Sequence, residues 1–152
     1  MGPGADLEGM IVRMGAAAER FGVPFRGTDR LYNTRLAQEL ALWAAAENRG
    51  DAFHLAVFRA YFVEGKDISS PAVLARTAAS VGLPEERAAE ILSLRTFSQA
   101  VDADWALAEG ERVRVVPTLI LGGDRLSGAQ GYAALAEFVE EHGVGKRAAA
   151  GG

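Results

Sequence analysis

The sequence predicts a mostly α-helical protein with one small β-hairpin near the C-terminus. Apolar residues recur every three or four positions from residue 7 to residue 109, which is the period of helices with one buried face. Over residues 113–127 this period gives way to an apolar run, two glycines and a short return segment, a pattern typical of a hairpin. A last helical pattern follows over residues 130–141. The predicted fold class is therefore mostly α, with two strands that are neighbours in sequence.

The composition is that of one globular domain and argues against several classes of partner. A chain of 152 residues is long enough to bury a sizeable core. A net charge of −4 disfavours nucleic acid or an anionic membrane as the main partner, since both attract basic surfaces. The sequence has no apolar run as long as a membrane span, and its first residues lack the features of an export signal. We therefore expect no nucleic acid or membrane partner, and a cytoplasmic location.

The sequence contains no cysteine, and this restricts its chemistry. Such a polypeptide forms no disulfide, offers no thiolate nucleophile and binds no metal through sulfur. Its two histidines, His54 and His142, have no neighbours in sequence that suggest a metal site or a Ser-His-Asp arrangement. We expect no catalytic residue, no metal site and no cofactor in this chain.

Seven helices are expected, and capping residues and glycines mark their ends. They cover about residues 7–21, 34–48, 52–63, 71–81, 84–94, 96–109 and 130–141. Asp6 is placed to cap the first helix and Gly22 to end it, because glycine readily adopts the left-handed conformation found at helix C-termini. We expect Gly50 to end the second helix, Asp51 to cap the third and Ser70 to cap the fourth.

Pro117 sets the start of the hairpin. Proline has no N–H to donate, so it belongs at the first residue of a strand or on an edge. We therefore interpret Thr118–Leu121 as an apolar strand, residues 122–124 as a tight turn and residues 125–127 as the return strand. An isolated hairpin is marginal in water, so we expect a second copy or a partner chain to cover the 118–121 strand.

Six short motifs follow one another between residues 33 and 141. They are Phe58-Arg59-Ala60-Tyr61-Phe62, Glu64-Gly65-Lys66-Asp67-Ile68-Ser69, Val81-Gly82-Leu83, Phe97 with Val101, Val116-Pro117-Thr118, and Ser127-Gly128-Ala129-Gln130. In this order and spacing they resemble the DsbA family of the thioredoxin superfamily and, within it, the FrnE-like oxidoreductases.

The resemblance implies an incomplete DsbA-like thioredoxin fold. In the family, a thioredoxin domain is interrupted by a helical insertion, to which residues 7–111 correspond, while residues 112–142 correspond to the C-terminal β-β-α of that domain. We expect residues 143–152, which are small and basic, to form a disordered tail. The β-α-β half with Cys-x-x-Cys has no counterpart, and Val115 stands where the family usually has glycine. The chain thus looks truncated, with the other half encoded upstream, lost, or supplied elsewhere.

The residues expected to bind a ligand are Val116, Pro117, Thr118 and Ser127. In the family, the cis proline that corresponds to Pro117 lies in a loop whose backbone pairs with a substrate peptide or with glutathione. The alternative is a trans proline that only begins an edge strand. Ser127 and the three residues after it have two interpretations. They either contact a ligand carboxylate at a helix N-terminus or form only a helix cap and packing turn.

The remaining aromatic residues and histidines are explained by packing. Trp43 and Trp105 lie on apolar helix faces, so we expect both in the core. His54 precedes Phe58 by one helical turn and is interpreted as a packed or half-exposed residue. His142 lies at the end of the last helix, where the helix dipole favours a cation.

Three functions stay open. The first is a DsbA/FrnE-like thiol-disulfide oxidoreductase that cannot perform dithiol chemistry alone, in effect a pseudoenzyme, because it has no cysteine. The second is a non-catalytic module that binds a partner or forms a dimer through the 118–121 strand. The third is a glutathione-binding protein similar to kappa-class glutathione transferases and chromene-carboxylate isomerases, which share the implied fold.

Overall fold

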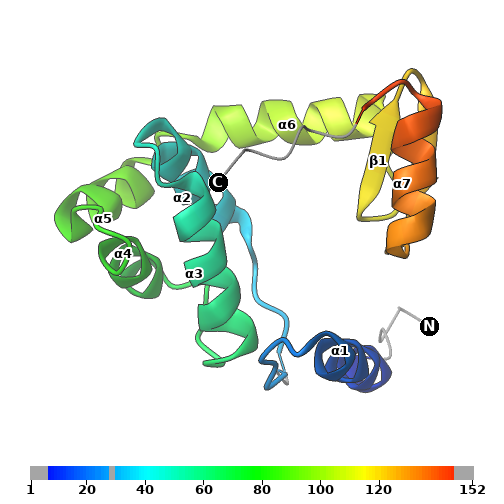
Figure 1. The fold of residues 1–152 in the computed structure, drawn as a ribbon. Coiled ribbons are helices and arrows are strands. Elements are labelled where there is room, and N and C mark those ends of the chain that lie inside the picture. The colour runs from blue at the N-terminus through cyan, green and yellow to red at the C-terminus, as the bar shows by residue number, and fades with distance from the viewer. Residues whose placement is uncertain (1–6, 28–29, 146–152) are drawn as a thin grey trace, which may run out of the picture. The chain divides into compact units, whose positions relative to one another are not determined.

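The computed structural model describes residues 7–27 and 30–145 and is shown in Figure 1. The chain divides into two compact units, Met1–Ala103 and Asp104–Gly152. The expected boundary between residues 111 and 112 separates the helical insertion from the C-terminal β-β-α of the family fold. Division into compact units does not test such a boundary, so it stays a prediction. Asp6, expected to cap the first helix, and the expected tail from residue 146 onward lie outside the described residues.

The described residues form helices and one small sheet. The helices are α1 (Leu7–Phe21), α2 (Arg35–Ala46), α3 (Gly50–Phe62), α4 (Pro71–Ala79), α5 (Glu85–Leu94), α6 (Ser98–Gly110) and α7 (Tyr132–Glu141), and the strands are β1 (Thr118–Leu121) and β2 (Asp124–Ser127). The predicted fold class is confirmed, and each expected helix is present with its ends within a few residues of the prediction. Across the described ranges, no helix is both long enough and apolar enough to cross a membrane.

Helices α2, α3, α4 and α5 pack around the hydrophobic core of the first unit. Helix α2 contacts the other three, and α4 lies against both α3 and α5. Leu40, Phe53 and Leu74, from three of these helices, have no exposed surface. Burial of such side chains stabilises the fold by about 1.5–3 kcal/mol each. Trp43 has 5% of its surface exposed, which confirms its predicted place in this core.

Two predicted helix ends are wrong, both in the connection between α2 and α3. Asn48, with a φ of 58°, adopts the left-handed conformation expected of Gly50, and Gly50 is the first residue of α3. A β-carbon on Gly50 would lie 3.2 Å from the Ala45 backbone, so glycine permits a close approach there and does not end a helix. Asp51 lies inside the first turn of α3 and is not its cap. Ser70 does occupy the N-cap position of α4, but its side chain makes no capping hydrogen bond.

Trp105 is half-exposed, so its predicted place in the core is wrong. Val101, one turn earlier on α6, is buried, whereas 52% of the Trp105 surface is exposed. The first compact unit ends at Ala103, between these two residues. The apolar stripe of α6 therefore continues beyond the unit in which Val101 is buried.

Helix α1 is joined to the core of the first unit through the segment that follows it. Gly22, with a φ of 65°, ends α1 as predicted. The Phe25 ring stacks on that of Phe62 in α3, with centroids 5.9 Å apart. The Arg26 N–H donates a hydrogen bond to the Phe62 carbonyl at 2.8 Å. These contacts join the segment after α1 to α3, and residues of both helices line a common pocket.

In the second unit, β1 and β2 form an antiparallel hairpin that is followed by α7. The register pairs Thr118 with Ser127. Gly122 and Gly123 form the turn with φ angles of 59° and 93°, and a type I′ turn requires positive φ at both positions. The predicted first strand is confirmed, and the return strand begins one residue earlier than expected, at Asp124.

Candidate functional site

The four residues expected to bind a ligand lie together at one end of the hairpin. The peptide bond between Val116 and Pro117 is cis, as the resemblance implies. Pro117 directly precedes β1, whose first residue, Thr118, is paired with Ser127, the last residue of β2. The two hydroxyl oxygens lie 3.3 Å apart. The hairpin thus brings residues nine positions apart in sequence into one site.

Two hydrogen bonds hold residues 115–118, here called the Pro117 loop, in place. The Thr118 hydroxyl donates to the Val115 carbonyl at 2.5 Å, and the Gly128 N–H donates to the Pro117 carbonyl at 2.8 Å. Val115, at the position where the resemblance implies glycine, is half-exposed. The loop backbone is therefore fixed by contacts within the second unit.

Val116 is the exposed member of this loop. Its accessible surface is 82% of the maximum. Within residues 7–27 and 30–145, its backbone N–H and carbonyl make no hydrogen bond. A fixed, exposed peptide group of this kind can pair with the extended backbone of another molecule, as the edge of a sheet does.

The segment after β2 is a turn that is separate from α7. Gly128 has a φ of 80°, and the Gln130 side-chain amide donates to the Ser127 carbonyl at 2.8 Å. Helix α7 begins at Tyr132 and has Gly131 at its N-cap position, without a side-chain capping bond. The packing turn is present, and because it separates Ser127 from α7, Ser127 neither caps that helix nor lies at its N-terminus.

A contact that no sequence motif signals joins the hairpin turn to the end of α7. The Nδ1 atom of His142 lies 2.7 Å from the Phe138 carbonyl oxygen, and its Nε2 atom lies 3.1 Å from Oδ2 of Asp124. The Phe138 carbonyl and then the Asp124 carboxylate raise the pKa of His142, because the protonated ring donates to both. Asp124 begins β2 at the turn, away from the Pro117 loop, so His142 stabilises the hairpin without joining the candidate site.

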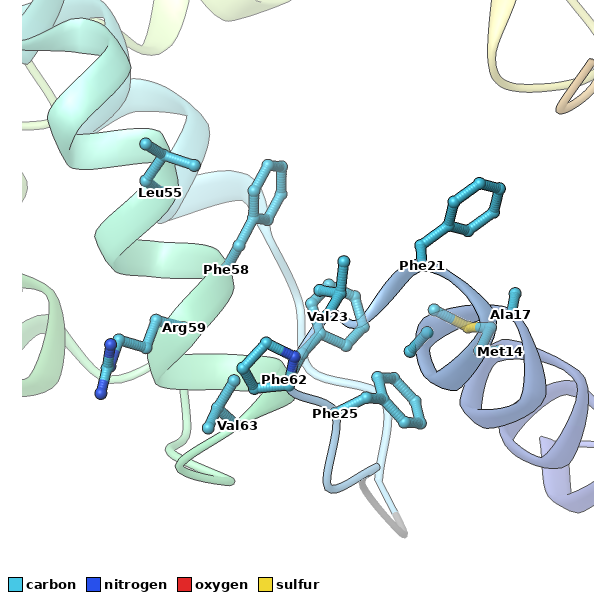
Figure 2. A pocket seen from close by; sticks show the side chains of 12 residues that line it. Met14, Ala17, Phe21, Val23, Phe25, Leu55, Phe58, Arg59, Phe62 and Val63 are labelled. Atoms are coloured by element: carbon cyan, nitrogen blue, oxygen red, sulfur yellow. The ribbon is translucent and has the colours of Figure 1, made fainter. Parts of the chain in front are cut away.

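One pocket of the first unit is apolar. It has a volume of about 560 Å³, and Figure 2 shows Phe21, Phe25, Phe58 and Phe62 gathered between α1 and α3. Among its lining residues only Arg59 is charged, and its side chain points away from these rings (Figure 2). The rings can bind apolar groups, but the pocket contains no nucleophile or proton-transfer group.

The chemistry open to the candidate site follows from its groups. The sequence has no cysteine, so the polar groups of the candidate site are the backbone groups of the Pro117 loop, the Thr118 hydroxyl and, from β2, the Ser127 hydroxyl. In the part of the chain that the structure describes, no three His, Asp or Glu side chains are arranged to hold a metal ion. His54 stacks on Phe58, with ring centroids 6.4 Å apart, and belongs to the first unit.

Comparison with known proteins gives one family and a set of similar structures. The model of the DSBA-like thioredoxin domain matches residues 4–140. A "putative protein disulfide isomerase" from Nitrosomonas europaea is 20% identical with a TM-score of 0.73, over 88% of this chain and 72% of that one. A 2-hydroxychromene-2-carboxylate isomerase is 22% identical with a TM-score of 0.76, over 89% of this chain and 66% of that one. At these identities the likeness concerns the fold. No curated protein matches the sequence significantly.

Proposed function

This chain belongs to the family of DSBA-like thioredoxin domains, and from that membership we propose that it binds an extended, cysteine-containing peptide at the Pro117 loop. Glutathione is a small ligand of this chemical class. The ligand backbone pairs with Val116, and the ligand provides the thiol that this polypeptide lacks. The chain acts as a binding protein of the oxidoreductase family and performs no dithiol exchange by itself, since it has no thiolate to attack a disulfide.

The proposal rests on the backbone N–H and carbonyl of Val116, which make no hydrogen bond within the described residues. Its N–H can donate to a ligand carbonyl and its carbonyl can accept from a ligand N–H, which is how a peptide adds to a strand edge. Each such bond contributes about 0.5–1.5 kcal/mol net. Together with a charge-assisted hydrogen bond from the Ser127 hydroxyl to a carboxylate of the ligand, two bonds correspond to a dissociation constant on the order of 1 mM.

Ser127 extends the proposed site beyond Val116. Its side chain is exposed, and its hydroxyl oxygen is 3.3 Å from that of Thr118. The Thr118 hydroxyl is already engaged with the Val115 carbonyl. The Ser127 hydroxyl is therefore the group that donates to a carboxylate of the bound peptide.

A second candidate function is isomerisation with bound glutathione. The observation that favours it is the likeness to 2-hydroxychromene-2-carboxylate isomerase over 89% of this chain. Turnover of 2-hydroxychromene-2-carboxylate in the presence of glutathione, followed by absorbance, would support this function. A reaction no faster than the protein-free solution would dismiss it and leave the binding proposal standing.

Calorimetric titration with glutathione tests the binding proposal through two variants of one residue. Val116→Pro removes the N–H donor, so we expect affinity to fall by about fivefold or more, the equivalent of one hydrogen bond. Val116→Ala keeps the N–H and should change the affinity by less than about threefold. Circular dichroism and thermal melting establish that both variants fold. Equal affinities in the two variants, or no binding at about 10 mM glutathione, would contradict the proposal.

A further inference from the structure

Two of the sequence motifs, residues 58–62 and 64–69, have no part in the proposed function, yet residues of both line a polar pocket between α3 and α4. The pocket has a volume of about 290 Å³. Its three cationic residues come from different segments: Arg59 from α3, Lys66 from the connection that follows and Arg76 from α4. The other lining residues are Ala56, Ala60, Glu64, Val73, Thr77 and Ser80. Pockets for drug-sized molecules begin at about 300 Å³, so this one suits a smaller ligand.

The pocket carries an excess of positive charge. Glu64 is its only carboxylate, and Oε2 of Glu64 lies 2.6 Å from Nζ of Lys66, while Oε1 lies 3.4 Å from Nε of Arg59. The Lys66 ammonium lowers the pKa of Glu64, so this carboxylate stays ionised at neutral pH. Three cations and one carboxylate leave a formal charge of +2. Within the described residues, Arg76 makes no ion pair.

The cationic groups are accessible to a ligand. The Arg59 side chain is 74% exposed and that of Lys66 55% exposed. Figure 2 shows the Arg59 side chain pointing away from Phe58 and Phe62. Its guanidinium group is therefore not packed against the rings of the apolar pocket. An anion that enters from solvent can therefore reach these cations without disturbing the core.

The hydroxyl groups of the pocket already have acceptors. Thr77 donates to the Val73 carbonyl at 2.8 Å, and Ser80 donates to the Thr77 carbonyl at 2.7 Å. They are therefore not free to donate to an anion. The donors available to a ligand are the ammonium of Lys66 and the guanidinium groups of Arg59 and Arg76.

We propose that this pocket binds a small phosphate monoester. A phosphate dianion matches the formal charge of +2, whereas a single carboxylate would neutralise half of it. Arg76 presents planar paired donors that fit phosphate oxygens, and Lys66 supplies a compact charge beside them. The pocket lies in the first unit and the Pro117 loop in the second, so this proposal stands independently of the proposed function.

Titration with inorganic phosphate and with glycerol phosphate, at constant ionic strength, tests this site by calorimetry. We expect saturable binding of both. Arg76→Gln should weaken it by about tenfold, the loss expected for one charge-assisted hydrogen bond. Glu64→Gln should strengthen it, because the competing carboxylate is gone. Arg87→Gln on α5 is the matched control: Arg87 is exposed, ion-paired and outside the pocket, so its loss should leave the affinity unchanged.

Three outcomes would overturn the phosphate site. One is the absence of saturable binding at about 10 mM phosphate. Another is an equal loss of affinity in Arg76→Gln and Arg87→Gln, which would show diffuse attraction to the whole surface. The third is unchanged affinity in both Arg76→Gln and Lys66→Gln, with melting temperatures like that of the unmodified protein.

Discussion

Glu39 is a buried carboxylate that depends on two arginines. Its side chain is 1% exposed. Arg95 donates to both of its oxygens, at 2.9 and 2.6 Å, and Arg35 donates to one at 2.9 Å. Arg35 also reaches Asp102 in α6 at 2.7 Å. An unpaired buried charge costs several kcal/mol. These hydrogen bonds therefore allow the Glu39 carboxylate to be buried. Arg95, followed by Arg35, lowers the pKa of Glu39 despite its burial.

Glu39→Gln should destabilise the first unit strongly. Removing one partner of a buried ion pair leaves the other uncompensated, and because Arg95 is half-exposed we expect a loss of about 2–3 kcal/mol. Glu90→Gln is the control, since Glu90 pairs with Arg87 at 2.6 Å but both side chains are more than half exposed. That pair should contribute less than about 1 kcal/mol. Urea denaturation measures both variants, and equal losses would contradict the role given to Glu39.

His142 predicts a dependence of stability on pH in the second unit. Its contacts with Phe138 and Asp124 raise its pKa above 6.5 in the folded state. The stabilisation is therefore complete below pH 6.5 and is lost as the pH rises through the folded-state pKa. Hydrogen exchange of the β1 and β2 amides should accelerate over that range, beyond the intrinsic effect of pH. In His142→Gln this extra acceleration should vanish. If it persists in the variant, the pH dependence comes from a group other than His142.

The hairpin turn depends on glycine at its first position. Gly122 has a φ of 59°, and a β-carbon there would lie 3.2 Å from Cδ2 of His142. The left-handed conformation costs an ordinary residue about 1–2 kcal/mol, so Gly122→Ala should destabilise the second unit by at least that amount. Gly110→Ala, at the end of α6, meets nothing within 4 Å and should be neutral or slightly stabilising. Thermal melting that ranks these two variants in the opposite order would contradict the turn geometry.

Local chemistry predicted the helices and the hairpin, and contacts distant in sequence account for the errors. Pro117 has no N–H, which was enough to place it before a strand. Gly50 was assigned to a helix end because glycine favours left-handed backbone, but the neighbouring Ala45 backbone gives it a different role. The pairing of Ser127 with Thr118 follows from the hairpin. The contact between His142 and Asp124 spans 18 residues and has no motif, so sequence reasoning could not find it.

The two-stranded sheet leaves an edge to be covered. Among the described residues β1 is hydrogen-bonded to β2 alone, and such a hairpin is marginal in water by itself. The chain corresponds to 72% and 66% of the two similar structures, so each contains segments that this chain does not match. We propose that a second copy pairs with the free edge of β1. Sedimentation equilibrium should then show a dimer at micromolar concentration, and a stable monomer throughout that range would contradict this pairing.

The chain as a whole combines a DSBA-like thioredoxin domain with a sequence that contains no cysteine. The proposed function assigns ligand binding to the exposed Val116 and assigns no dithiol exchange to a chain without cysteine. The proposed function therefore depends on where a cysteine-containing peptide binds.

Nuclear magnetic resonance titration of ¹⁵N-labelled protein with glutathione tests that claim most directly. The amide signals of Val116, Thr118 and Ser127 should shift together and saturate with one dissociation constant on the order of 1 mM. Signals of Leu40 and Leu74, buried in the first unit, should stay in place. Shifts confined to the first unit, or no shift at about 10 mM glutathione, would contradict the account.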